Sequence, residues 1–356
     1  MRMLAIVGLA AASAIVVSAA PPLYFPSADA AWEHVAPAEA GWNQAALSAA
    51  VEYAGTRQSS GVVILAGGRL LAERYWDVSG PAGYTRTQHG RTADGHPMED
   101  VASAQKSVVA LLAGMAERRR QLSLDAPVHQ YLGSGWSKAD RPAEARITVR
   151  HLMTMTSGLN DSLVYQQPAG TVWRYNTGAY SRMIPILEKA TGTGIATLTE
   201  RWLTGPTGMA NSKWMERPWA AGNDAANAIG FVTTARDLAR FGLLVLNRGV
   251  WHERDLLENP TYLDRMLTSS QGLNRSYGLL WWLNGQTGMA AGGVKHDSLI
   301  PTAPRDLVAA QGAMGRKVYI VPGLQLVVTR IGADPGDGFD EAFWSRLMKA
   351  TPVSVQ

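Results

Sequence analysis

The chain has 356 residues, of which 46% are hydrophobic and 17% charged, with a formal net charge of +4 and no cysteine. This composition is typical of a globular protein that buries one large core or two modest ones, and it excludes a disordered chain. The small net charge comes without a long run of lysine or arginine, so we expect no nucleic-acid partner.

The first residues have the pattern of a secretory signal peptide. Arg2 precedes an apolar stretch from Leu4 to Val17, and small residues follow around Ser18. We expect residues 1–20 to be a signal peptide, with a second candidate cleavage site near residue 30, and the protein to be secreted or periplasmic in a bacterium. The alternative is an uncleaved inner-membrane anchor, the one case in which we expect membrane contact, because the stretch approaches the ~20 residues that span a bilayer.

The next elements are a helix and a hairpin. Residues 41–53 have helical spacing of apolar side chains, and two strand-like runs, 62–66 and 70–76, flank the Gly67-Gly68-Arg69 turn. Residues 77–97 are rich in Gly, Arg and Thr and predict a loop. From Ser103 to about Ala116 nearly every position is apolar or small, which predicts a helix buried on most sides.

The middle of the chain is predicted to be mainly helical, and its end returns to strands. Helix signals recur at 149–155, 183–190, 195–203 and 235–246. Strand signals follow at 277–283, 317–321 and 325–331, before a terminal helix at 339–350. This order predicts an α+β fold, in which the N- and C-terminal segments form one antiparallel sheet flanked by helices. We expect a single catalytic domain at 41–350, with 41–102 and 270–350 in its α/β part and 103–269 as an inserted, mainly helical region.

Ser103-Ala104-Gln105-Lys106 places an alcohol and an amine on one face of the buried helix. A serine hydroxyl is a weak nucleophile until its proton is taken, and an amine desolvated by apolar neighbours has a pKa low enough to take it. Taken alone, such a tetrapeptide is commonly a solvent-exposed serine and lysine without a catalytic function. Here the helix has almost no polar face, so a charged lysine at its head indicates a function.

Two further segments complete the candidate site. Tyr175 follows a polar loop, and beside a protonated lysine its phenol pKa would fall, which makes it a candidate general base; the alternative is a loop anchor. The segment from Gly312 to Gly315 and Arg316 leads into a strand, where the backbone N–H groups of Ser103 and Arg316 are candidates for an oxyanion hole. The alternative is an ordinary glycine-rich turn.

The histidines indicate no metal site, because none has HExxH or paired ligand spacing. His151 has no nearby aspartate at a suggestive position and no Gly-x-Ser-x-Gly elbow exists, so we expect a structural role for it. We also expect no cofactor. The pair Trp281-Trp282 is predicted to be sheet core, with one ring as an alternative wall of the acyl pocket.

The order of these segments resembles the serine β-lactamase and penicillin-binding-protein superfamily. The match covers about residues 41–335: Ser103 to Lys106 is similar to the first motif, Tyr175-Asn176-Thr177 to the second, and Gly312 to Arg316 stands on the third-motif strand. The phrases Ile147 to Leu159 and Gly230 to Leu238 are similar to class C-like esterases and 6-aminohexanoate-dimer hydrolases. The resemblance implies an acyl-enzyme on Ser103, managed by Lys106 and Tyr175, and a substrate-binding role for Asn176, Thr177, Gly315 and Arg316.

Two departures from the family pattern shape the expected function. Thr177 replaces the expected amide, and Ala313-Met314-Gly315 replaces a third motif that begins with Lys or His. Without that cation, binding of a β-lactam carboxylate should be weaker. We therefore expect a small-molecule ester, amide or peptide substrate, with a carboxylesterase or small amidase favoured over a D-amino-acid peptidase or β-lactamase. A catalytically silent cell-wall-binding protein is the alternative from another class.

Overall fold

The computed structural model describes residues 22–28 and 31–352, so the predicted signal peptide lies outside the described residues. Within those ranges, no helix combines the length and the apolar character needed to cross a bilayer.

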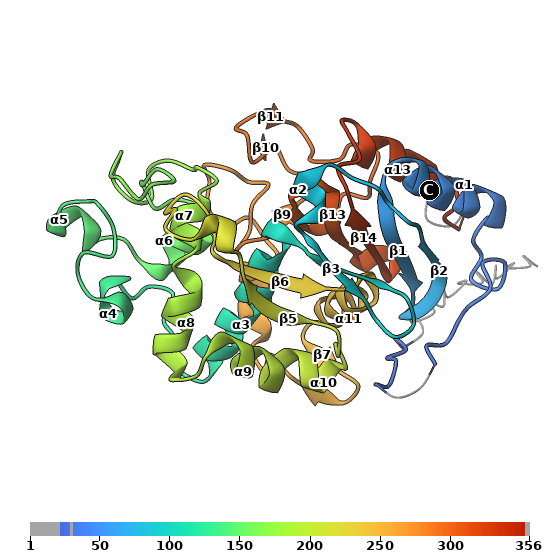
Figure 1. Ribbon diagram of the computed structural model, residues 1–356, viewed down its shortest axis with the longest axis horizontal. Helices are drawn as coiled ribbons and strands as arrows, with labels where there is room; N and C mark the ends of the chain where they lie inside the picture. The colour runs from blue at the N-terminus through green and yellow to red at the C-terminus, as the bar shows by residue number, and fades with distance from the viewer. Residues whose placement is uncertain (1–21, 29–30, 353–356) are drawn as a thin grey trace, which may run out of the picture.

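The sheet at the centre of the fold is antiparallel and joins the two ends of the chain. Its six strands have the order β2-β1-β14-β13-β12-β9. Their bounds are β1 Ser59–Ala66, β2 Arg69–Tyr75, β9 Trp282–Leu283, β12 Val308–Gly312, β13 Arg316–Val321 and β14 Leu326–Gly332. Because β1 pairs with β14 over nearly its whole length, the N-terminal hairpin and the last strands form one surface. The predicted α+β class and the sheet shared by both termini are confirmed (Figure 1).

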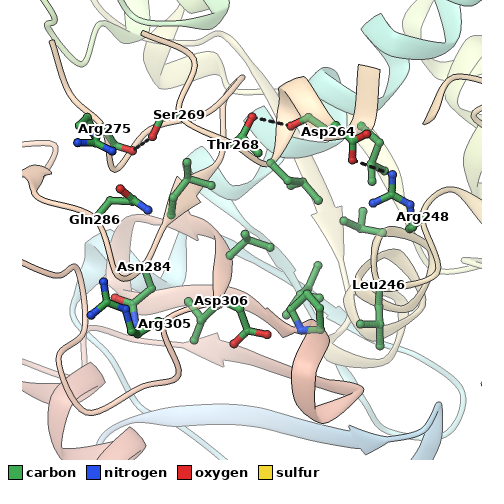
Figure 2. Close-up of a pocket in the computed structure, with 18 residues that line it drawn as sticks. Leu246, Arg248, Asp264, Thr268, Ser269, Arg275, Asn284, Gln286, Arg305 and Asp306 are labelled. Atoms are coloured by element: carbon green, nitrogen blue, oxygen red, sulfur yellow. Dashed lines mark hydrogen bonds and ion pairs between the residues drawn. The ribbon is translucent and has the colours of Figure 1, made fainter. Parts of the chain in front are cut away.

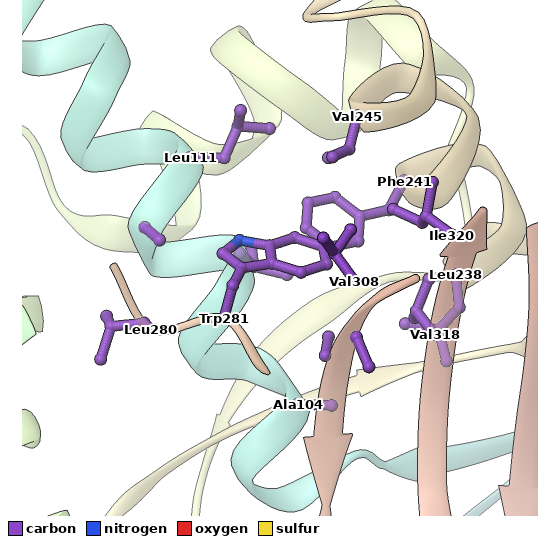
Figure 3. Close-up of a cluster of buried hydrophobic side chains, with 14 of the residues drawn as sticks. Ala104, Leu111, Leu238, Phe241, Val245, Leu280, Trp281, Val308, Val318 and Ile320 are labelled. Atoms are coloured by element: carbon purple, nitrogen blue, oxygen red, sulfur yellow. The ribbon is translucent and has the colours of Figure 1, made fainter. Parts of the chain in front are cut away.

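Helices pack against the sheet. α1 (Gln44–Thr56) packs on the terminal helix α13 (Phe339–Met348), while α11 (Ala235–Leu246) contacts β1, β13 and β14. Gly242 allows the close approach of α11, because a Cβ there would lie 2.5 Å from Val327. Figure 3 shows Trp281 between α3 (Gln105–Arg118) and α11, where it is fully buried and stacks on Phe241 at 5.9 Å. Trp281 is therefore part of the core, although it packs between two helices and precedes the strand β9.

The helical region lies to one side of the sheet (Figure 1). Besides α3 it contains short helices: α4 His129–Leu132, α5 Arg141–Glu144, α6 Val149–Met153, α7 Thr177–Tyr180, α8 Met183–Thr191, α9 Ile195–Thr199, α10 Gly205–Thr207 and α12 Pro260–Met266. A π-helical turn, Glu200–Thr204, follows α9. α3 contacts α8, α12 and β12, so the helix that begins beside Ser103 connects the two regions.

A second sheet corrects part of the sequence prediction. Its order is β3-β4-β6-β5, with β3 Gln88–Arg91, β4 Pro97–Asp100, β5 Lys213–Glu216 and β6 Ile229–Thr233. The predicted loop 77–97 was therefore wrong in part, since it contains β3 and the short helix α2 (Ala82–Thr85). Two strand pairs complete the list: β7 Val250–Trp251 with β8 Arg254–Asp255, and β10 Gly288–Met289 with β11 Lys295–His296.

The predicted strand 277–283 was also wrong over most of its length. Only β9 and an isolated bridge between Tyr277 and Trp282 form. Leu280 has φ +60° and the Gly278 N–H donates to the Trp281 carbonyl, so the chain turns instead of extending.

Candidate active site

Ser103 lies on a sharp turn between the second sheet and α3. After β4, the Ala102 N–H donates to Asp100 Oδ1 at 3.0 Å, and Ala102 has φ +50°, a left-handed conformation that costs free energy for a non-glycine residue. A short 3-10 helix, Ala102–Ala104, then leads into α3. Ser103 is thereby held at the head of the buried helix.

Lys106 is hydrogen-bonded to the candidate nucleophile. Its Nζ lies 2.9 Å from Ser103 Oγ, and the residue is only 3% exposed. The rings of Tyr175 and Tyr180 lie 5.1 and 4.4 Å from the ammonium. Burial, and then the nearby Arg217 cation, lower the pKa of Lys106 to about 7. Near neutral pH a large fraction of the amine is therefore unprotonated and able to accept the Ser103 proton.

Tyr175 reaches the same place from the loop before α7. Its ring stacks on Trp282 at 5.7 Å and meets Tyr277 edge-on at 6.4 Å. Burial raises the pKa of Tyr175 to about 12, although hydrogen bonding with Ser103 opposes that rise. The lowered phenol pKa expected from the sequence was wrong, because the loss of hydration on burial outweighs the hydrogen bond with Ser103. Tyr175 thus keeps its proton at neutral pH.

The two residues after Tyr175 have different environments. Asn176 is 1% exposed, and its carboxamide caps α7 by accepting from the Ala179 N–H at 2.8 Å. Its Nδ2 donates to the carbonyls of Leu159 and Asn160 at 2.8 and 3.0 Å. Both Nδ2 hydrogens are therefore used within the protein and the side chain is buried, contrary to the expected binding role. Thr177 does line the cavity beside Ser103.

The β12–β13 hairpin forms the wall opposite the helical region. Gly312 pairs with Arg316 and packs against the nucleophile turn, where a Cβ would lie 2.1 Å from the Val101 carbonyl. Ala313 and Met314 line the cavity. Gly315, at φ +67°, does not face the cavity, because a Cβ there would lie 2.8 Å from Pro335.

The Arg316 side chain does not replace the missing third-motif cation. Its Nη2 donates to Thr87 Oγ1 at 2.6 Å and to Glu99 Oε2 at 3.2 Å, and the residue has no exposed surface. The alternation of a strand directs this guanidinium into the protein. The expected substrate contact by the Arg316 side chain is therefore contradicted, and only its backbone remains a candidate.

Ser103 opens into a cavity of about 260 Å³. It is lined by Gly83, Arg86, Thr87, Asp100, Ala102, Ser103, Lys106, Thr177, Arg217, Trp219, Ala226, Asn227, Ala313, Met314 and Arg316. The cavity combines apolar wall with a few charged groups, as small-molecule sites do.

One ion pair in this wall was not predicted from the sequence. Arg217 Nε lies 2.6 Å from Asp100 Oδ2, its Nη2 lies 2.6 Å from Asp100 Oδ1, and both residues are buried. The same Nη2 donates to Gln105 Oε1 at 3.0 Å, and Gln105 precedes Lys106 on α3. The pair fixes the residues on both sides of Ser103 and holds a positive charge near Lys106. No spacing motif links positions this far apart, so single-sequence reasoning had no signal for it.

A larger cavity, of about 580 Å³, lies elsewhere, between α12, the end of α11 and the β9 edge of the sheet (Figure 2). Its Arg248 is paired with Asp264 at 2.7 Å, and its Ser269 hydroxyl donates to the Arg275 carbonyl at 2.5 Å. Among the described residues, no lysine or histidine lines it to activate that serine, so its size alone does not indicate catalysis.

His151 has a structural role. Its N–H donates to Thr148 Oγ1, and its Nδ1 accepts from the Thr148 N–H at 3.1 Å, which forms a capping box at α6. Across residues 22–28 and 31–352, no group of three or more His, Cys, Asp or Glu side chains is arranged to hold a metal ion.

The fold and the positions of these residues define a β-lactamase-like protein. The family model "Beta-lactamase" matches residues 44–350, so the chain belongs to this family. Among curated proteins, no sequence matches the chain.

Three solved structures show the likeness of fold. A Bacteroides dorei DSM 17855 protein, provisionally assigned as a β-lactamase, is 20% identical with a TM-score of 0.65, covering 87% of this chain and 99% of its own. A Bacillus anthracis protein, provisionally assigned as a 6-aminohexanoate-dimer hydrolase, is 17% identical with a TM-score of 0.59, covering 84% and 80%. EstCE1, a hydrolase with promiscuous acyltransferase activity, is 17% identical with a TM-score of 0.58, covering 86% and 97%. The predicted superfamily is confirmed, and at these identities the structures show the fold alone.

Proposed function

We propose that the protein is a serine hydrolase that cleaves ester or amide bonds through an acyl-enzyme on Ser103. The observation that carries this proposal is the 2.9 Å contact between Lys106 Nζ and Ser103 Oγ, made by a lysine that is 3% exposed. A buried amine held on a serine hydroxyl is an arrangement that activates a nucleophile, and burial of a lysine without such a use would only destabilise the fold.

The proposed reaction has two steps. Unprotonated Lys106 accepts the Ser103 proton while Oγ attacks the substrate carbonyl, and the oxyanion is stabilised by the backbone N–H groups of Ser103 and Arg316, each worth about 2.7–4 kcal/mol. The protonated phenol of Tyr175 relays a proton to the leaving group, and Lys106 resupplies it. Water then attacks the acyl carbon while Lys106 takes one of its protons, and that proton passes to Ser103 Oγ as the bond between Oγ and the acyl carbon breaks.

An ester or small amide fits this cavity better than a β-lactam. The hairpin presents Ala313 and Met314 to the cavity, whereas the Arg316 guanidinium is buried on Glu99, so no cation extends from the third-motif position. The similarity of fold to EstCE1 and to a provisionally assigned 6-aminohexanoate-dimer hydrolase supports the same substrate class.

The test compares p-nitrophenyl butyrate with the β-lactam nitrocefin. We expect turnover of the ester, much slower turnover of nitrocefin, and loss of both in Ser103→Ala. The matched control is Ser107→Ala, since Ser107 is a buried serine on the same helix whose hydroxyl donates to the Leu280 carbonyl. Nitrocefin turnover faster than ester turnover would refute the substrate assignment, and full ester activity in a folded Ser103→Ala variant would refute the mechanism.

A further inference from the structure

An arginine and a tryptophan meet in the wall of the Ser103 cavity. Arg86 follows α2, and Trp219 lies in a 3-10 turn, Pro218–Ala220, between β5 and β6. The Arg86 guanidinium lies 5.0 Å from the Trp219 ring centroid, and Trp219 is 53% exposed, which is unusual for a large aromatic side chain. Both residues line the cavity into which Ser103 opens.

Arg86 differs from the other two arginines of this wall in having no acidic partner. Arg217 is paired with Asp100 and Arg316 with Glu99, while Lys106 contacts Ser103. Arg86 is exposed, and within the described parts of the chain no carboxylate pairs with its side chain. Of the described residues that line the cavity, Asp100 alone is acidic, and Arg217 already neutralises it. Among the arginines in the described lining of the cavity, Arg86 is therefore the one whose positive charge no carboxylate compensates.

We propose that Arg86 and Trp219 form a subsite for a carboxylate carried by the substrate, so that the enzyme prefers esters or amides whose acyl arm ends in a carboxylate. The inference rests on the proposed hydrolase and names its substrate class. A guanidinium presents paired N–H donors that match a carboxylate, and stacking on an aromatic ring holds its plane in place. The exposed indole also offers apolar surface to the methylene groups of the arm.

The subsite is built from other elements than the hairpin on which the family's third motif would supply a cation. The hairpin offers only Ala313, Met314 and a buried Arg316, whereas α2 and the Pro218–Ala220 turn supply the free charge. A carboxylate close to the scissile bond, as in a β-lactam, would have no cation on the hairpin, but one on a flexible arm could reach Arg86.

The kinetic test uses mono-p-nitrophenyl glutarate and its methyl ester, which differ in one negative charge. We expect the wild-type protein to prefer the anionic ester in kcat/KM, and Arg86→Gln to lower kcat/KM for that ester by about tenfold or more, as for a lost charge-assisted contact. The methyl ester should change by less than about twofold, because it makes no such contact. Arg86→Lys should retain part of the preference.

Arg346→Gln is the matched control. Arg346 is also an exposed arginine that stacks on an aromatic ring, 4.1 Å from the Tyr53 centroid, but it lies on α13 and does not line the cavity. It should change neither ester. Equal effects of Arg86→Gln on the two esters, or no effect on either, would overturn the subsite.

A binding test separates this inference from the proposed chemistry. Calorimetry on Ser103→Ala protein compares glutaranilic acid with its methyl ester, which requires no turnover. We expect tighter binding of the acid and loss of that difference when Arg86→Gln is added; equal binding of the two in Ser103→Ala would overturn the subsite. If the acid binds more tightly than its methyl ester and Arg86→Gln removes that difference, but the wild-type protein turns over no ester, the hydrolase is refuted and the subsite is retained. If the wild-type protein turns over esters but the acid and its methyl ester bind equally, the subsite is refuted and the hydrolase is retained.

Discussion

Lys106 carries an amine in an environment that disfavours its charge. Three contributions act on it: the loss of water at 3% exposure, the Arg217 cation, and two tyrosine rings that partly compensate the ammonium. The first two lower its pKa to about 7, close to the pH at which a general base is most effective. The Tyr175 phenol, with its pKa raised to about 12, is suited to donate or relay a proton.

The pH dependence of the reaction follows from the lowered pKa of Lys106. Because the unprotonated amine is the active form in the proposed mechanism, kcat/KM for a neutral ester should rise with pH and level off above about 7. The measurement is kcat/KM for p-nitrophenyl butyrate from pH 5.5 to 9, corrected for spontaneous hydrolysis. A rate that falls between pH 6 and 8, or a flat profile, would contradict the role of Lys106 as the base.

The charge of Arg217 should set the position of that rise. Arg217 disfavours the protonated amine, so Arg217→Gln should raise the pKa of Lys106 and move the rise in kcat/KM to higher pH. In this variant the unpaired Asp100 carboxylate adds to the effect by favouring the ammonium. The double variant Asp100→Asn/Arg217→Gln removes both charges and should shift the profile less. A uniform loss of rate in Arg217→Gln with no change in the shape of the profile would show that Arg217 acts through structure alone.

Among the secondary-structure elements, the β12–β13 hairpin and the turn before α3 depend on each other. β12 contacts the 3-10 helix that carries Ser103, and Gly312 lies at the closest point of that contact. The polar cluster behind the hairpin fixes its position: Glu99 accepts from Ser60 Oγ at 2.5 Å, from Tyr84 OH at 2.7 Å and from Arg316. The nucleophile and its candidate oxyanion donors are thus held by two sheets at once.

A methyl group at position 312 should disrupt this contact. Gly312→Ala places a Cβ 2.1 Å from the Val101 carbonyl and 3.1 Å from the Ala104 nitrogen, so β12 must move away from Ser103. We expect a loss of kcat of at least about tenfold, as for a displaced catalytic group, and a lower Tm. Gly272→Ala is the control, since no atom lies within 4 Å of a Cβ there. Unchanged kcat in Gly312→Ala would contradict the proposed role of this contact.

Helices and strands that are indicated by adjacent residues could be predicted from the sequence. Strands that form only by pairing with a segment far along the chain could not. The apolar run after Ser103 predicts α3, and the spacing of Ser103 and Lys106 within one helix predicts their contact. β3 was missed because its sheet requires β6, which comes far later in the chain. The strand at 277–283 failed because a positive φ at Leu280 breaks a run that is uniformly apolar.

The same distinction applies to the site. Asp100 and Arg217 are 117 positions apart, and only the folded chain brings them together. The direction of the Tyr175 pKa shift was predicted wrongly, because the residues adjacent to Tyr175 in the sequence do not reveal how deeply its side chain is buried in the fold. Asn176 resembled a binding residue by position, whereas its environment makes it a helix cap.

Across the whole molecule, the segment that begins at residue 22 is attached to the body of the protein. The guanidinium of Arg240, on α11, donates to the carbonyls of Pro26 at 2.9 Å and Ser27 at 3.0 Å, and the Tyr24 N–H donates to the Gly67 carbonyl at 2.9 Å. Arg240 is 8% exposed, so removal of these acceptors would leave buried donors without partners. This favours the proposal that export removes residues 1–20 rather than 1–30.

Two truncated proteins test this proposal. A chain beginning at residue 21 should unfold at a higher temperature than one beginning at residue 31, because only the first retains Pro26 and Ser27. Arg240→Met should lower the Tm of the longer chain and reduce the difference between the two. Equal Tm values for both chains, measured by circular dichroism, would contradict the structural role of this segment.

The central claim is that Ser103 forms the covalent intermediate, and labelling with a fluorophosphonate tests it most directly. Peptide mass spectrometry of the labelled protein should find one phosphonyl adduct, on Ser103, formed faster as pH rises through about 7 and absent in Ser103→Ala. Absence of any adduct on the folded wild-type protein, or an adduct on a different residue that persists in Ser103→Ala, would contradict the assignment of Ser103 as the nucleophile.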